Sequence, residues 1–359
     1  MPDRRITLRP ERTPGAPIDI PTFQNGAFSE DDFYSVWERN KLVVVRGIDR
    51  TLQGAWTPAF LMKRFGRERV KPIYCGTDIE AEGEYTLADF LSAFEGGDSC
   101  DALKLKDWPP QDLFRQKFPD YHDSFIEAIP VPTRDVAALN GVKNLAAHFD
   151  RSGCPPDLGP KMYVAYGNPH SSHGTTKLHL DFTDAVNLMT FCPDPSQVGA
   201  VWHASPPESQ PHIRHHLRTM YPTEYERTDP IHSQESYITD QVWEDLRLQY
   251  GVQYVRIEQF VGDAIFIPAG WPHQEGSSRI HGLSILINAV KIACDFVSLH
   301  NLDVTAGMVP QQRAHRLNSG GHGEDLLQLD TLVWHAWRSL STFPASAMLT
   351  EAQFIGGGM

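Results

Sequence analysis

The 359-residue sequence has little cysteine and no long hydrophobic run, and each absence excludes a class of protein. Its five cysteines lie far apart and never form a Cys-x-x-Cys pair. We therefore expect neither a disulfide framework nor a cysteine-based zinc module. No stretch of about 18 apolar residues occurs, so no segment is expected to cross a membrane. The polar start of the chain lacks the apolar core of a secretory signal, and a reducing compartment is expected.

An excess of positive charge is also missing. Lysine and arginine total 32 against 45 aspartate and glutamate residues, which gives a formal net charge of −13 at pH 7. Gripping a phosphate backbone requires clustered lysine and arginine, so direct sequence-specific DNA binding is not expected. An acidic surface is better suited to receive a basic partner.

The hydrophobic pattern divides the chain into four segments. We expect a lead-in and helix over residues 1–40, a mixed helix and strand segment that packs on the core over 41–160, a β-rich core over 161–300 and a helical segment over 301–359. In the first segment, Ser29 is a candidate N-cap, and Asp32 three positions later completes a capping pattern.

The β-rich core is indicated by short apolar runs that Gly, Pro, Asn and Ser clusters separate. Strands are expected at 42–45, 161–166, 177–182, 185–191, 200–203, 252–260, 263–267 and 283–292, and helices at 212–220, 239–250 and 326–340. Many short strands with turn signals between them are typical of a sandwich or barrel. The fold class predicted is mainly β with flanking helices (α+β).

Two His-x-Asp triplets are candidates for a metal site. Non-haem Fe(II) oxygenases hold iron with two histidines and one carboxylate, which leaves positions open for cosubstrate and oxygen. His148 and Asp150 leave a helical pattern and enter a loop, whereas His179 and Asp181 alternate with apolar residues in the expected strand 177–182. Alternation places the second pair on one strand face. A structural His–Asp pair without a metal remains the alternative.

A second histidine ligand must come from a distant strand. His273 follows the apolar run 263–267 and a turn stiffened by proline and glycine at 268–272. A rigid backbone before a ligand is useful because metal geometry tolerates little slack. A surface turn histidine is the alternative at this position.

The stretches around these histidines resemble the Jumonji C (JmjC) domain. They are Gly174 to Asp181, Gly262 to Gly270 and His273-Gln274. The sequence is similar to the lysine-demethylase-3 group, demethylases of lysine 9 of histone H3, from about residue 40 to about residue 340. Further similar stretches are 103–110, 156–163, 202–203, 229–232, 250–252 and 295–298. A resemblance of this length selects His179 and Asp181 over His148 and Asp150.

The resemblance implies a double-stranded β-helix (a jelly-roll, cupin-like core) that binds Fe(II) through His179, Asp181 and His273. It implies 2-oxoglutarate and O₂ as cosubstrates, and removal of methyl groups from mono- and dimethyl-lysine by N-methyl hydroxylation and formaldehyde release. The histone H3 tail and chromatin-associated proteins would be the partners, and the location would be nuclear.

The chain departs from the family pattern around the expected 2-oxoglutarate site. Many JmjC proteins hold the distal carboxylate with a Thr three residues before the first His and a Lys about 17 residues after it; Thr176 fits the first position, but residue 196 is Ser. Strict alternation would turn Thr176 away from His179. We expect Lys291 to replace the missing lysine, against the alternative of a surface lysine, and Asn187 to be a further cosubstrate contact.

A second departure follows His273. The chain carries about eight extra residues between residues 275 and 287 relative to the group. Three functions therefore stay open: a histone lysine demethylase, a JmjC hydroxylase of another protein substrate, and a catalytically silent JmjC chromatin scaffold.

Overall fold

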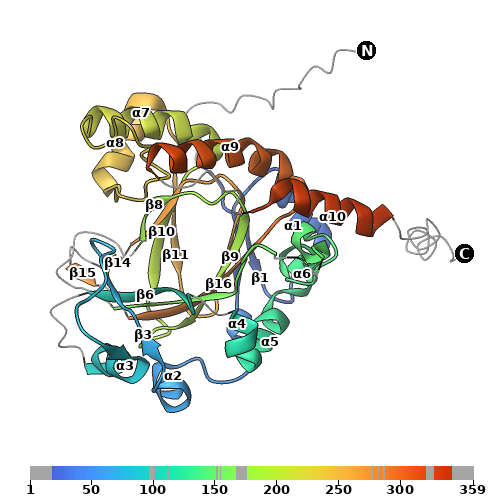
Figure 1. The fold of residues 1–359 in the computed structure, drawn as a ribbon, viewed down its shortest axis with the longest axis vertical. Helices are drawn as coiled ribbons and strands as arrows, with labels where there is room; N and C mark the ends of the chain where they lie inside the picture. Colours follow the sequence, from blue (N-terminus) through green and yellow to red (C-terminus); the bar gives the residue numbers. More distant parts are fainter. Residues whose placement is uncertain are drawn as a thin grey trace, which may run out of the picture.

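Two facing β-sheets form the centre of the molecule, and helices pack around them (Figure 1). The computed structural model describes residues 18–96, 102–110, 113–150, 153, 155–166, 176–276, 278–280, 283–285, 288–320 and 327–341. This is the expected α+β fold with a double-stranded β-helix core. No helix in these ranges combines the length and the apolar character needed to cross a bilayer.

The larger sheet has eight strands, which come from both halves of the chain. Its order is β1 (Thr22–Gln24), β2 (Val43–Arg46), β12 (Ala264–Ile267), β9 (Asp184–Phe191), β16 (Ala289–Phe296), β7 (Lys161–Ala165), β6 (Leu103–Trp108) and β4 (Ile73–Tyr74). Except for the parallel β1–β2 pair, the neighbours are antiparallel. The segment before residue 161 therefore supplies strands to the same sheet that the core strands form.

The smaller sheet carries the two histidines of interest. Its order is β11 (Val255–Gln259), β10 (Ala200–Ala204), β13 (His273–Gly276) and β8 (Thr176–His179), so β8 is an edge strand. Two short pairs complete the strands: β3 (Arg69–Val70) with β5 (Tyr85–Thr86), and β14 (Ser278–Ile280) with β15 (Leu283–Ile285).

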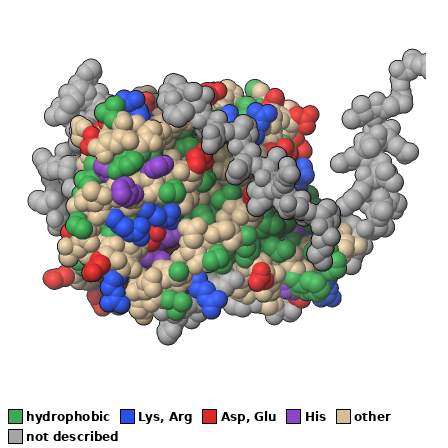
Figure 2. Space-filling view, turned by 90° about the horizontal axis from the view of Figure 1, so that it is seen from above, with side chains coloured by type: hydrophobic (Ala, Val, Ile, Leu, Met, Phe, Trp, Pro, Cys, Tyr) green, Lys and Arg blue, Asp and Glu red, His purple; other side chains and the backbone are tan. Residues whose placement is uncertain are grey.

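Ten α-helices lie in the described part of the chain. They are α1 (Glu30–Trp37), α2 (Pro58–Phe65), α3 (Leu87–Gly96), α4 (Phe114–Lys117), α5 (Pro119–Ala128), α6 (Val131–Ala137), α7 (Gln210–Met220), α8 (Asp240–Tyr250), α9 (Leu302–Asn318) and α10 (Leu329–Ser341). The helices α7, α8 and α9 cover one end of the sheets, and α2 to α5 lie toward the other (Figure 1). Seen from the first end, the surface carries gathered histidine and basic side chains beside an apolar area (Figure 2).

The helix α1 begins as predicted. The Ser29 side chain accepts a hydrogen bond from the Asp32 amide (3.2 Å), and the Asp32 carboxylate accepts one from the Ser29 amide (2.9 Å). This helix presents Phe33 and Trp37 to the larger sheet, where Trp37 stacks on Phe296 with ring centroids 5.7 Å apart. Aromatic packing of this kind fixes the sheet behind the cavity.

Two expected strands differ from the structure. The strand expected at 177–182 ends at His179, so Asp181 lies in the short connection between β8 and β9. The expected strand 283–292 is wrong as one element, because β15 ends at Ile285 and β16 begins at Ala289. The strand β15 instead pairs back on β14, with Ser278 opposite Ile285, in the region of the expected extra residues. Residues 277, 281–282 and 286–287 lie outside the described residues.

Candidate metal centre and adjoining cavity

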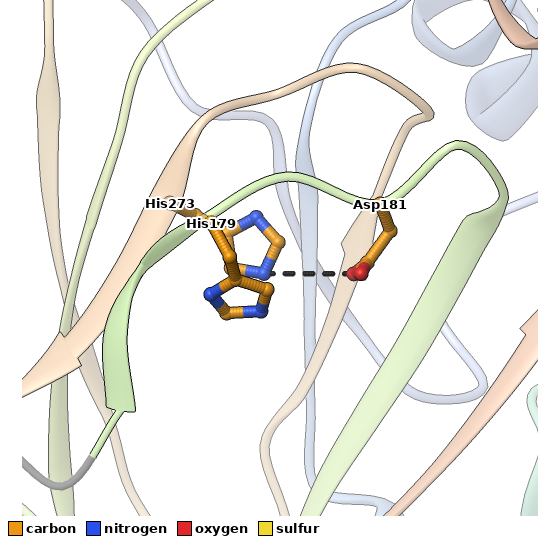
Figure 3. A group of neighbouring side chains, drawn as sticks. All are labelled: His179, Asp181 and His273. Carbon is orange, nitrogen blue, oxygen red and sulfur yellow. Dashed lines mark ion pairs between the residues drawn. The ribbon is translucent and has the colours of Figure 1, made fainter. Parts of the chain in front are cut away.

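The strands β8 and β13 bring the two histidines together. They are antiparallel neighbours, and His179 is the direct partner of His273 in the register. The ring centroids are 4.2 Å apart. Asp181 completes the group in Figure 3, with one ligand atom from each of the three residues within 4.8 Å of the others. Two imidazoles and one carboxylate on one side of a common point suit a divalent metal with open positions.

Each histidine is oriented by a backbone carbonyl. The Nδ1 atom of His179 lies 2.8 Å from the Lys177 carbonyl oxygen, and Nδ1 of His273 lies 2.8 Å from the Trp271 carbonyl oxygen. Because a carbonyl oxygen can only accept a hydrogen bond, Nδ1 of each ring carries the proton. The lone pair of each ring is therefore on Nε2, the atom left to bind a metal.

The electrostatics of the site keep His179 neutral. Burial, together with the neighbouring His273, lowers the pKa of His179 to about 4, although Asp181 opposes the shift. A neutral imidazole is the form that binds a metal. The Nε2 atom of His273 lies 3.7 Å from the Asp181 carboxylate. The three side chains thus present two Nε2 nitrogens and one carboxylate, a set that fits Fe(II).

The turn before His273 is held from several sides, as its proline and glycine content predicted. Gly270 has a φ of +81° and donates its amide hydrogen bond to the Asp181 carbonyl (2.9 Å). The buried Trp271 indole donates to the Asn40 side chain (2.8 Å). The Gly270 bond links the turn before His273 to the backbone of Asp181. The Trp271 bond anchors the same turn to Asn40, shortly after the end of α1.

A buried carboxylate fixes the same turn. Asp184 accepts hydrogen bonds from the amides of Ala269 (2.9 Å) and Ser298 (3.0 Å), from the Ser298 hydroxyl (2.5 Å) and from the Asn301 side chain (2.8 Å). Burial raises the pKa of Asp184 to about 6, although these donors oppose the shift. Asp184 therefore joins the turn before His273 to the start of α9.

Thr176 faces the cavity despite its odd spacing from His179. The β8–β13 ladder is irregular, because the three-residue step from Thr176 to His179 lies opposite the two-residue step from Glu275 to His273. Such a bulge inserts an extra residue into one strand and re-aims its side chains. The structure therefore places Thr176 where the family resemblance expects it; its role as a cosubstrate contact stays a prediction.

A cavity of about 250 Å³ lies between the two sheets and contains the candidate ligands. Its polar lining includes Lys104, Lys106, Asp107, Tyr163, Thr176, His179, Asp181, Asn187, Gln234, His273, Glu275, Lys291 and Asp295. All six residues predicted for the site therefore meet in one cavity. Asn187 is buried there, 3.4 Å from the Gln259 amide nitrogen.

Lys291 is inside the cavity, so the alternative of a surface lysine is wrong. It is only 3% exposed, and its ammonium lies 5.5 Å from the centroid of the Trp202 ring. It forms an ion pair with Glu275, a residue that the sequence reasoning did not single out. The signal was present, because Glu275 follows His273 by two positions and so shares its strand face.

A second cavity of about 280 Å³ adjoins the first and is rich in carboxylates. The two share Asp107, Tyr163, Ala293 and Asp295 as lining residues. The Tyr163 hydroxyl donates to Asp107 (2.6 Å). Burial raises the pKa of Asp295 well above its ordinary value, and the nearby Asp181 and Asp107 carboxylates raise it further. A cation in this region would relieve the repulsion among these carboxylates.

The rejected triplet lies elsewhere. The His148 ring is held by the Val142 carbonyl (2.9 Å) and by the Ser339 hydroxyl of α10 (3.0 Å). These contacts give His148 a structural role beside the last turn of α10. Among the described residues, His179, Asp181 and His273 are the group found close enough to share a metal ion.

The fold and the site define a JmjC-domain protein. The family model described as "JmjC domain, hydroxylase" matches residues 175–279, the stretch that contains all three candidate ligands. Beyond this domain, the chain is similar to proteins named for lysine demethylation. It is 32% identical to lysine-specific demethylase 3A of Homo sapiens over 85% of this chain, and 31% identical to lysine-specific demethylase 3 of Drosophila melanogaster over 88% of it. Lysine-specific demethylase JMJ29 of Arabidopsis thaliana is 27% identical over 77% of the chain. The match covers 26%, 41% and 40% of these relatives, respectively.

Proposed function

We propose that this chain is an Fe(II)- and 2-oxoglutarate-dependent oxygenase that removes methyl groups from histone lysine, with mono- and dimethylated lysine 9 of histone H3 as the substrate. His179, Asp181 and His273 would hold the iron through two Nε2 atoms and one carboxylate. The iron, 2-oxoglutarate and O₂ supply the oxidising chemistry when bound. The JmjC hydroxylase domain and the names of the relatives support this class of reaction.

The protein's own part would be to hold the cosubstrate and the substrate next to the metal. Thr176, Asn187 and Lys291 are the proposed cosubstrate contacts. Lys291 and Thr176 would face the distal carboxylate, so this end of the cavity would orient the ligand rather than react with it.

The observation that carries the substrate assignment is the carboxylate-rich second cavity that adjoins the metal centre. Asp107 and Asp295 line both cavities, and Asp157 lines the second, where it is paired with Lys161 at 2.6 Å. A methylated lysine keeps its positive charge, so the Asp107 carboxylate, which lines both cavities, favours its entry over that of a neutral side chain. The net charge of −13 also favours a basic peptide such as the histone H3 tail. Nuclear localisation and contacts with chromatin-associated proteins belong to the same proposal.

The test is formaldehyde release from a histone H3 peptide dimethylated at lysine 9, in the presence of Fe(II), ascorbate and 2-oxoglutarate. His179→Ala should abolish release, and His148→Ala, the matched change in the other triplet, should not. Consumption of 2-oxoglutarate without release of formaldehyde would contradict demethylation of this peptide and favour a hydroxylase that acts on another substrate. If the metal-loaded protein neither releases formaldehyde nor consumes 2-oxoglutarate, the proposal of an enzyme is contradicted and a catalytically silent scaffold is favoured.

A further inference from the structure

The end of the cavity that is proposed to hold the distal carboxylate of the cosubstrate already contains a carboxylate of the protein. Glu275 and Lys291 form an ion pair between the two sheets, and their side chains are 11% and 4% exposed. In the smaller sheet, Glu275 is the register partner of Thr176 on one side and of Trp202 on the other. The Glu275 carboxylate therefore lies among the residues expected to receive a ligand carboxylate.

The other buried lysine of this cavity does not offer a spare charge. Lys104 is 7% exposed on its side chain and is paired with Asp78 at 2.6 Å. The same aspartate also receives Lys177 at 3.4 Å. The exposed Lys106 contacts the Gln234 amide oxygen at 3.4 Å. In the part of the chain that the structure describes, both buried lysines of the cavity wall, Lys104 and Lys291, are thus paired with a carboxylate.

We propose that Glu275 is a specificity-determining residue for the cosubstrate, because it holds the Lys291 ammonium that a distal carboxylate would otherwise bind. A dicarboxylate has to compete with Glu275 for Lys291, whereas a 2-oxo acid that lacks the distal carboxylate leaves the ion pair undisturbed. The inference rests on the proposed function, since it assumes that a 2-oxo acid binds the metal in this cavity.

The consequence for affinity follows from an exchange of partners. A hydrogen bond to a charged group ordinarily strengthens binding by about tenfold to about a hundredfold. Here the ligand carboxylate has to share Lys291 with Glu275 or displace it, and two carboxylates then lie in one buried region. The distal carboxylate should therefore add little to the affinity of the wild-type protein, and much more once Glu275 is neutral.

The test compares two ligands of equal chain length. Titration calorimetry of the full chain loaded with Co(II) gives dissociation constants for 2-oxoglutarate and for 2-oxopentanoate, which lacks the distal carboxylate. The ratio of the two dissociation constants gives the contribution of the distal carboxylate to the affinity. We expect a ratio within about threefold in the wild type and about tenfold or more in Glu275→Gln. Combining Glu275→Gln with Lys291→Gln should return the ratio to the wild-type range.

Matched measurements separate the possible failures. Glu258→Gln alters a half-exposed glutamate that pairs with Arg256 on β11 of the same sheet, and should leave the ratio unchanged. Co(II) affinity and circular dichroism report whether Glu275→Gln is folded; if it is not, Glu275→Asp, whose shorter side chain withdraws from Lys291, replaces it. A wild-type ratio of tenfold or more that Glu275→Gln does not change would overturn the role of Glu275 while leaving the proposed function standing. If Co(II) binds and neither 2-oxo acid does, the proposed function and this inference fail together.

Discussion

Replacing Asp184 by asparagine removes one buried negative charge while keeping the size of the side chain. In the folded protein, burial raises the pKa of this carboxyl from 3.8 to about 6. Because the folded-state pKa is raised, the stabilising contribution of the group is fully present below pH 3.8 and is lost as the pH rises through about 6. The asparagine variant has no such titration.

The expected size of the effect follows from these two pKa values. Between about pH 4.5 and about pH 7.5, the wild type should lose about 2 kcal/mol of unfolding free energy relative to Asp184→Asn. A second effect is independent of pH. The NH₂ group of the asparagine is a donor, and it would face groups that donated hydrogen bonds to the carboxylate, among them the amides of Ala269 and Ser298. A buried donor without an acceptor costs about 1–3 kcal/mol.

Urea unfolding of the metal-free protein, followed by tryptophan fluorescence at both pH values, measures the difference directly. Asp194→Asn is the control, because Asp194 is an exposed carboxylate whose pKa is lowered by hydrogen bonds from Ser196. Its small pH dependence should have the opposite sign. A wild-type advantage over Asp184→Asn that stays constant or grows toward neutral pH would refute the reasoning.

Three further predictions concern the metal site and the elements that hold it. His179→Ala should weaken Co(II) binding by more than about a hundredfold, since changes in residues behind metal ligands already weaken binding by up to that amount; His148→Ala should leave the calorimetric affinity unchanged. Gly270→Ala should lower the unfolding free energy in urea by about 2–4 kcal/mol, because a Cβ would lie 2.9 Å from Val304 at a φ of +81°; a loss under 1 kcal/mol would contradict the close approach. Ser29→Ala should remove about 1 kcal/mol through loss of the N-cap, and an unchanged urea midpoint would argue against the capping box.

The candidate metal site could be predicted because its signals are local. A two-residue spacing marks His179 and Asp181, and a turn rich in proline and glycine precedes His273. Even here one detail differed, since Asp181 lies beyond the end of β8 rather than on it. The two-residue spacing still brings Asp181 close to His179, because two residues of chain cannot carry the aspartate far from the end of β8.

The cosubstrate end could not be predicted in the same way, because it depends on pairing between distant strands. The orientation of Thr176 is set by a bulge against β13, and a bulge is a property of two strands rather than of one. The partner of Lys291 comes from the opposite sheet. Periodicity within a single strand carries no information about either arrangement.

The expected strand at 283–292 failed for a related reason. An apolar run reads as one strand whether it pairs with one neighbour or divides between two. In the structure its beginning, β15, forms a hairpin with β14, while β16 crosses to the larger sheet. The choice between these pairings is made by tertiary contacts.

The direct pairing of His179 with His273 gives the metal a mechanical part to play. Among the described strands, β8 has β13 as its one neighbour at the edge of the sheet, and His273 follows His179 by 94 positions in the sequence. A bound ion would clasp this edge strand to its neighbour, and at a hundred times its dissociation constant would add about 2.7 kcal/mol of stability. The concentration of metal would then set the stability of the folded protein as well as the activity of the proposed enzyme.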